Sequence, residues 1–286
     1  MLLPYKITRA QIFPRSCTGF TAFTTQYRIA PEAGLLLGAG RAILLQLAHP
    51  QIGRAIAEHS GFAANPLSRL VHTLGYIYAL SNGTAAQQRA IIDYVNAAHR
   101  PVRGRRNDAM PAYSALDPKL QLWVAATLYD SARTIAGQIL EESKDEQEEL
   151  YSQYARLGDA LQMPGGCWPK DLSRFDEYLA RNLATLHVTE QSRELARELF
   201  EARNAPWWIR IGMPLMRDVS IAQLPGPVRE DFGYRLTARA EKRNARVIAV
   251  ARVATRILPR FIRHAPMRLV LRRVEKMARA GGNSRP

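Results

Sequence analysis

Apolar residues recur along most of the chain at the three- and four-residue spacing of an amphipathic helix. The expected helices cover about residues 31–48, 50–59, 66–80, 84–99, 171–186, 189–203, 226–240 and 241–263. Another helix is expected to begin at Asp117-Pro118, and an amphipathic one lies within 141–159. No stretch shows sustained alternation of apolar and polar residues, which a half-buried strand would need. The pattern therefore predicts an all-α fold, organised as a single compact multi-helix domain.

Proline and glycine mark the expected breaks between these helices. His49-Pro50 divides the first apolar run, because the residue before a proline avoids helical conformation. Turns or loops are expected at 62–66, 104–108, 164–169 and, as a proline-rich connection, 206–227. The chain thus divides into an irregular arm over 1–30, a helical domain over 31–240 and basic amphipathic helices over 241–286.

Composition is that of a globular protein, with 47% hydrophobic and 23% charged residues among 286. The longest apolar run, residues 35–48, includes Arg41 and Gln46. It is shorter than the roughly 20 residues of a transmembrane helix, so none is expected. Cys17 and Cys167 form neither a disulfide framework nor a zinc pattern. The expected location is cytoplasmic, at or near the inner face of a membrane.

Positive charge is concentrated at the end of the chain. Residues 235–286 contain 15 Lys or Arg and 2 acidic residues, a net +13 of the total +15. Arginines and apolar residues line different sides of the predicted helix over 241–263, as in a helix lying on an anionic membrane. A helix docked on the core with a solvated basic face has the same pattern. Nucleic acid is disfavoured as a partner because the tail has few aromatic residues for base stacking.

The chain has no phosphate-binding loop, no GxSxG nucleophile turn and no HExxH zinc motif. The first of two candidate sites combines Arg69, His72 and Thr73 at positions i, i+3 and i+4 of one helix face. Together a cation, an imidazole and a hydroxyl can hold an oxygen-derived ligand or a propionate. The alternative is a plain helix face on which Arg69 pairs with an acid and Thr73 bonds to its own turn.

The second candidate is His99, which ends an apolar helix and is followed four residues later by Arg103. An imidazole at that position suits a haem iron, and Arg103 can meet a haem propionate. The alternative is a histidine that interacts with the negative end of the helix dipole.

The residues of several segments resemble the family that groups the ER-bound oxygenase MpaB with the catalytic domain of rubber oxygenase. The segments are 38–50, 58–60, 65–73, 99–104, 117–118, 122–131, 224–225 and 229–233. The resemblance covers about residues 30–245. It implies an all-helical protein with one haem b and oxygen chemistry at carbon–carbon double bonds.

The resemblance also implies roles for individual residues. His99 falls on the proximal iron ligand, Arg103 on a supporting basic residue, and Arg69 and Thr73 on positions near bound oxygen. His72 replaces a lysine of rubber oxygenase. It would either become a second iron ligand or stay back as a hydrogen-bond donor or proton shuttle. Glu58 is the nearest match to the distal acid, and Pro101, which follows Arg100, weakens the match at Arg103.

The expected function is therefore a haem b-dependent oxygenase that uses O2 and a separate reductant. Its substrate would be apolar, such as a lipid, an isoprenoid or a polyketide, because a helical pocket of this kind is largely hydrophobic. The alternative is a non-enzymatic helical binding protein attached to a membrane surface through its basic tail.

Overall fold

The computed structural model describes residues 28–59, 66–108, 110–161 and 163–282. The expected arm over 1–30 and the turn at 62–66 lie mostly outside these ranges. The 3-10 helix η2 is Ala33–Gly38, and the first α-helices are α1 (Ala39–Leu47), α2 (Pro50–His59), α3 (Pro66–Asn82), α4 (Ala85–His99), α5 (Pro118–Ile139) and α6 (Lys144–Asp159). They are followed by α7 (Leu172–Leu183), α8 (Glu190–Glu201), α9 (Trp207–Gln223), α10 (Gly226–Asp231), α11 (Ala238–Ile257), α12 (Arg260–Arg263) and α13 (Ala265–Gly282). The predicted all-α fold is confirmed.

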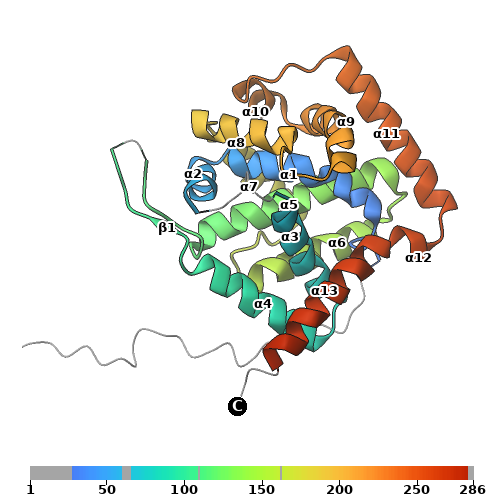
Figure 1. The fold of residues 1–286 in the computed structure, drawn as a ribbon, viewed down its shortest axis with the longest axis horizontal. Coiled ribbons are helices and arrows are strands. Elements are labelled where there is room, and N and C mark those ends of the chain that lie inside the picture. Colours follow the sequence, from blue (N-terminus) through green and yellow to red (C-terminus); the bar gives the residue numbers. More distant parts are fainter. Residues whose placement is uncertain (1–27, 60–65, 109, 162, 283–286) are drawn as a thin grey trace, which may run out of the picture.

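Two very short strands form an antiparallel hairpin between α4 and α5. Strand β1 is Arg103–Gly104 and β2 is Tyr113–Ser114, with Arg103 opposite Ser114. The expected loop at 104–108 lies within the connection of this hairpin. Figure 1 shows the hairpin projecting from one end of the helical body.

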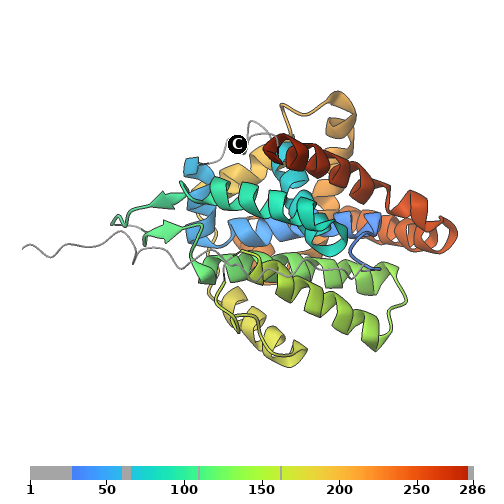
Figure 2. The same ribbon diagram turned by 90° about the horizontal axis from the view of Figure 1, so that it is seen from below.

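Helix α5 lies at the centre of the packing. It begins at Asp117, whose carboxylate accepts a hydrogen bond from the backbone N–H of Lys119, with Pro118 in the first turn. Its buried residues face α1 and η2 on one side and α6 on another. The turned view places α6 and α7 on one side of the body and α13 on the opposite side (Figure 2).

Helix α13 packs across α3 and α4 (Figure 1). Gly75 on α3 lies at this contact, where a Cβ would be in ordinary van der Waals contact with Val274 at 3.4 Å and Ile91 at 3.5 Å. Val270 and Val274 of α13 are buried at this contact. The end of the chain therefore forms part of the cover over α3 and α4.

A buried arginine connects the first helix to the rest of the core. Arg41 on α1 is 2.6 Å from the Asp130 carboxylate on α5, and both side chains are nearly inaccessible to solvent. The same guanidinium donates hydrogen bonds to the Ser131 hydroxyl and to the backbone oxygen of Gln223 at the end of α9. Asp130 also pairs with Arg133. The two further hydrogen bonds of Arg41 and the pairing of Asp130 with Arg133 offset the desolvation cost of this charge pair.

Residues 206–227, expected as a connection, instead form α9 over most of their length, so that prediction was wrong. Pro206 occupies the N-cap position, where its missing N–H costs nothing. Pro214 lies inside the helix and removes one backbone hydrogen bond, but burial of Val219 and Ile221 compensates for that loss.

The helices predicted at 226–240 and 241–263 begin or end at other residues in the structure. Helix α10 ends near Gly233, whose φ of +75° is left-handed, and Tyr234 N–H bonds back to the Arg229 oxygen. Helix α11 begins at the Thr237 cap and ends before Pro259. The apolar spacing continues through the turn at Gly233, so the sequence pattern did not show that the helix is interrupted there.

We predict that Asp130→Asn lowers the free energy of unfolding by about 3–5 kcal/mol, because it leaves the Arg41 charge buried and uncompensated. The measurement is urea unfolding followed by circular dichroism. Glu177→Gln is the matched control, since its ion pair with Arg174 is exposed and should change stability by less than about 1 kcal/mol. Equal effects of the two substitutions would refute the role given to the buried pair.

Candidate functional site

Helices α3 and α4 bring His72 and Tyr94 together. Their ring centroids are 4.9 Å apart, and the Tyr94 hydroxyl oxygen is 3.3 Å from each ring nitrogen of His72. Burial lowers the pKa of His72 from its usual value. The imidazole is therefore neutral near pH 7, and a neutral imidazole can bind a metal or exchange a hydrogen bond with a ligand.

Thr73 is the next residue of α3 and is half-buried. Arg69 lies one turn earlier in the same helix, and its side chain is outside the described part of the structure. Helical conformation from 66 to 82 gives Arg69, His72 and Thr73 the i, i+3, i+4 geometry of one face.

His99 is the last residue of α4, a helix that begins with a capping box between Thr84 and Gln87. The ring of His99 is half-buried and its Nδ1 atom is inaccessible to solvent. The chain then turns, with the Val102 N–H donating to the His99 carbonyl oxygen. Arg103 follows in β1 with an exposed side chain.

Glu58 holds the hairpin to the end of α2. Its carboxylate accepts a 2.7 Å hydrogen bond from Arg54 and a 2.5 Å hydrogen bond from the Tyr113 hydroxyl of β2. Both hydrogen bonds lower the pKa of Glu58, and the bond from Tyr113 has the larger effect. His59 Nε2 lies 3.1 Å from the Arg103 carbonyl oxygen and donates to it in the matching tautomer. The end of α2 thus positions both strands of the hairpin.

His49 is a half-buried histidine between α1 and α2, in the first segment of the resemblance, and it was not among the candidate site residues. Its ring centroid is 6.4 Å from that of Trp123, and burial lowers its pKa. Within the described residues, its buried Nδ1 atom has no hydrogen-bond partner. The sequence signal was its position directly after the apolar run of α1.

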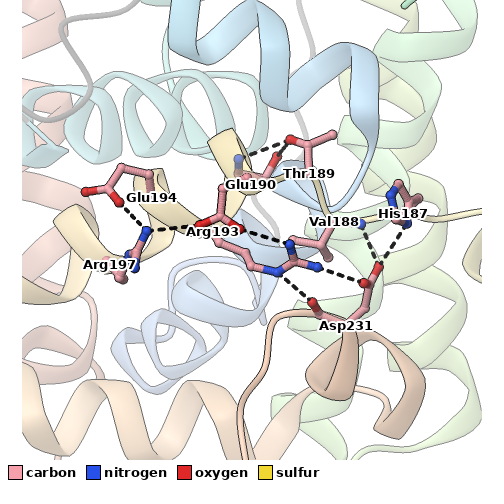
Figure 3. Close-up of polar contacts among 9 residues, drawn as sticks. His187, Val188, Thr189, Glu190, Arg193, Glu194, Arg197 and Asp231 are labelled. Carbon is pink, nitrogen blue, oxygen red and sulfur yellow. Dashed lines mark hydrogen bonds and ion pairs between the residues drawn. The ribbon is translucent and has the colours of Figure 1, made fainter. Parts of the chain in front are cut away.

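The C-terminal segment 229–233 that carries the resemblance forms a polar cluster with the start of α8 (Figure 3). The Asp231 carboxylate accepts a 2.6 Å hydrogen bond from the Val188 N–H and pairs with Arg193 at 3.2 Å. His187 lies 3.7 Å from the same carboxylate, and its side chain is 74% exposed. These contacts join α10 to the loop before α8.

Other residues of the resemblance are structural. Arg41, Asp130 and Ser131 form the buried charge cluster, and Gln46 donates a 3.2 Å hydrogen bond to the Thr127 hydroxyl. Many residues that carry the resemblance therefore belong to the contact between α1 and α5. The candidate site residues lie mainly on α3 and α4.

Comparison with known proteins identifies the family. Residues 27–256 match the family model described as "ER-bound oxygenase mpaB/B'/Rubber oxygenase, catalytic domain". The chain belongs to this family, whose defining domain is an oxygenase catalytic domain.

Two curated relatives are uncharacterised proteins of Mycobacterium tuberculosis and Mycobacterium bovis. Each is 31% identical over 226 residues, which cover 76% of this chain and 87% of the relative. No solved structure gives a significant match. Among the described residues, no helix has both the length and the apolar character needed to cross a bilayer.

The donor side chains on α3 and α4 are of the kind that can bind a haem iron. No group of three or more His, Cys, Asp or Glu side chains that could hold a metal ion occurs in the described ranges. Haem b requires only one or two protein ligands, because the porphyrin supplies the other four. The neutral, half-buried His72 and the histidine that ends the neighbouring α4 provide donors of the right kind.

We predict that Glu58→Gln makes the hairpin over 103–114 lose protection from amide hydrogen exchange. In the unchanged protein the same loosening should appear as the pH falls through the lowered pKa of Glu58, below the ordinary value of about 4.3. A depressed carboxyl pKa stabilises the folded contact at higher pH, and this contribution disappears on protonation. Hydrogen–deuterium exchange provides the measurement, and Glu148→Gln on the exposed side of α6 serves as the control. Unaltered protection in Glu58→Gln would show that the contact with Tyr113 does not hold the hairpin.

Proposed function

We propose that the protein is a haem b-dependent oxygenase that acts on an apolar substrate. The observation that supports this most directly is the pairing of helices α3 and α4, which carry His72 and His99 in a family of oxygenase catalytic domains. When bound, haem b supplies the iron at which O2 is activated for transfer to the substrate, with electrons from a separate reductant.

His99 is the residue proposed to hold the iron. It has the neutral-ligand chemistry of an imidazole at a helix end, and its half-buried ring limits competition from water. Arg103 and Arg69 are proposed to pair with the haem propionates, as guanidinium groups do with carboxylates.

The face of α3 is proposed to polarise oxygen and supply a proton. The hydroxyl of Thr73 and the guanidinium of Arg69 are hydrogen-bond donors for an oxygen ligand. His72 is proposed as a hydrogen-bond donor and proton shuttle, because a neutral imidazole has one nitrogen that donates a hydrogen bond and one that can accept a proton.

Glu58 is proposed to act by positioning. Arg54 and Tyr113 occupy its two carboxylate oxygens, and its lowered pKa keeps it ionised at neutral pH. It therefore holds β2, the strand that pairs with the one carrying Arg103.

An apolar substrate is supported by the side chains around α3 and α4. The three helices α3, α4 and α13 contribute buried residues that share aliphatic or aromatic side chains: Tyr76, Ile77, Tyr78, Ile91, Val270 and Val274. Such surroundings favour a lipid, an isoprenoid or a polyketide over a sugar or a nucleotide.

We further propose that the protein is cytoplasmic and attaches peripherally to the inner face of a membrane through its basic C-terminal helices. The concentration of positive charge over 235–286 supports this attachment, because an anionic leaflet attracts each lysine or arginine near its surface. The same attachment is compatible with the alternative, a non-enzymatic binding protein at the membrane.

Protein purified from haem-sufficient cells should have a Soret absorption band, and His99→Ala should lose most of it. His187→Ala is the matched control, because this exposed histidine lies in the cluster with Asp231. Absence of the band from the unchanged protein, or a full band in His99→Ala, would refute the haem assignment.

A second spectral prediction concerns His72. Its contact with Tyr94 supports a role as hydrogen-bond donor rather than as a second iron ligand. His72→Ala should therefore keep the Soret band, and the ferric protein should give a high-spin signal in electron paramagnetic resonance. A low-spin signal typical of two histidine ligands that is lost in His72→Ala would show that His72 binds the iron.

A further inference from the structure

Helices α9, α11 and α12 expose an extended apolar surface, which we call the outer face. Its most exposed members share large hydrophobic side chains that are 64–73% accessible: Trp207, Ile211, Val250, Ile257 and Phe261. On α9 the apolar stripe continues at Leu215, because residues at i, i+4 and i+8 lie on one side of a helix. Large exposed apolar side chains on neighbouring helices are candidates for a binding surface.

A groove of about 620 Å³ runs into the outer face between η2, α9, α11 and α12. Its size falls within the roughly 300–1,000 Å³ of small-molecule sites. The apolar residues that line it are Ala33, Leu37, Leu215, Val247, Val250, Ala251, Ala254, Leu258 and Ile262. Their surface suits an aliphatic chain.

The arginines that line the groove differ in their partners. Arg243 is paired with Asp218 at 2.5 Å, and Arg263 with Glu32 at 2.5 Å. Arg246 is exposed and has no ion pair among the described residues. One guanidinium at the groove is thus available for an anion from outside the protein.

Charge distinguishes between the occupants that an apolar groove can have. A second copy of the chain would bring two arginine-rich surfaces together, since residues 238–263, which include α11 and α12, contain eight Lys or Arg and one acidic residue. A lipid with an anionic head and an apolar chain matches both the free arginine and the groove.

We propose that this groove is a lipid-binding site, which takes one acyl chain of an anionic phospholipid from the bilayer while Arg246 binds the lipid phosphate. The exposed residues of the outer face contact the surrounding leaflet. The inference rests on the proposed peripheral attachment and is independent of haem. It adds a specific lipid site to an attachment that was argued from net charge alone.

The first test uses lysophosphatidylglycerol below its micelle concentration, with binding measured by isothermal titration calorimetry. We expect one lipid per protein, and Ala254→Trp, which fills the groove, should weaken binding at least about tenfold. Ala249→Trp is the matched control, because Ala249 is an exposed residue of α11 outside the groove lining. Equal affinities of Ala254→Trp and the unchanged protein would overturn the proposal.

The second test examines the head group. Arg246→Ala should weaken binding of lysophosphatidylglycerol by about two- to fivefold, as expected for one exposed ion pair. Arg239→Ala, another exposed position of α11, should leave the affinity unchanged. If Arg246→Ala and Arg239→Ala have the same effect, Arg246 does not bind the phosphate.

Vesicle flotation separates the site from general attachment and from other ligands. Vesicles of phosphatidylcholine with phosphatidylglycerol should carry the protein, and Ala254→Trp should reduce the bound fraction. Salt-sensitive flotation that is identical in the two proteins would leave peripheral attachment intact and overturn the lipid site. Binding of free oleate without vesicle binding, or a dimer in light scattering that Ile257→Glu dissociates, would overturn it in favour of a fatty acid or a second copy.

Discussion

The buried ion pair between Arg41 and Asp130 is the constraint on which the core depends. Removing two charges from water is costly, so the pair is stable only while its other hydrogen bonds are in place. Arg41 reaches Ser131 on α5 and the end of α9, and Asp130 reaches Arg133. A shift of α1 along α5 would break the contacts of Arg41 with Asp130, Ser131 and the end of α9 together. The pair therefore fixes one register between helices whose aliphatic surfaces would tolerate several.

The remaining layers are built around this fixed pair of helices. Helix α2 follows α1 directly and holds the hairpin through Glu58 and Tyr113, while α3 and α4 bear the candidate site. His72 and Tyr94 both lie on helices, so their contact does not depend on the conformation of a loop. A site on helices of this kind is held more precisely than one on loops. The outer face lies on other helices, so lipid contact and the proposed oxygen chemistry use different parts of the fold.

The helical class and most helix positions could be predicted from sequence, because amphipathic spacing and caps are local properties. Thr84, Asp117 and Thr189 each cap a helix close to the expected start. Helix α9 was missed because its prolines were interpreted as breaks, and the burial that compensates for Pro214 is tertiary. The i, i+3, i+4 spacing of Arg69, His72 and Thr73 on α3 could be predicted directly from the sequence. The contact between His72 and Tyr94 could not, because it depends on how α4 rotates against α3.

The ion pairs of Glu32, near the start of the described fold, have a consequence for the order of folding. Glu32 precedes η2, is almost fully buried, and binds Arg263 and His264 at the junction of α12 and α13. These partners are separated by more than two hundred residues, so this contact forms only after Arg263 and His264 have left the ribosome. Helix α13 follows Arg263 and His264 in the chain, so the surface of α3 and α4 that it covers remains open until α13 has been synthesised. During synthesis, the layer that bears the candidate site is therefore the last to be enclosed.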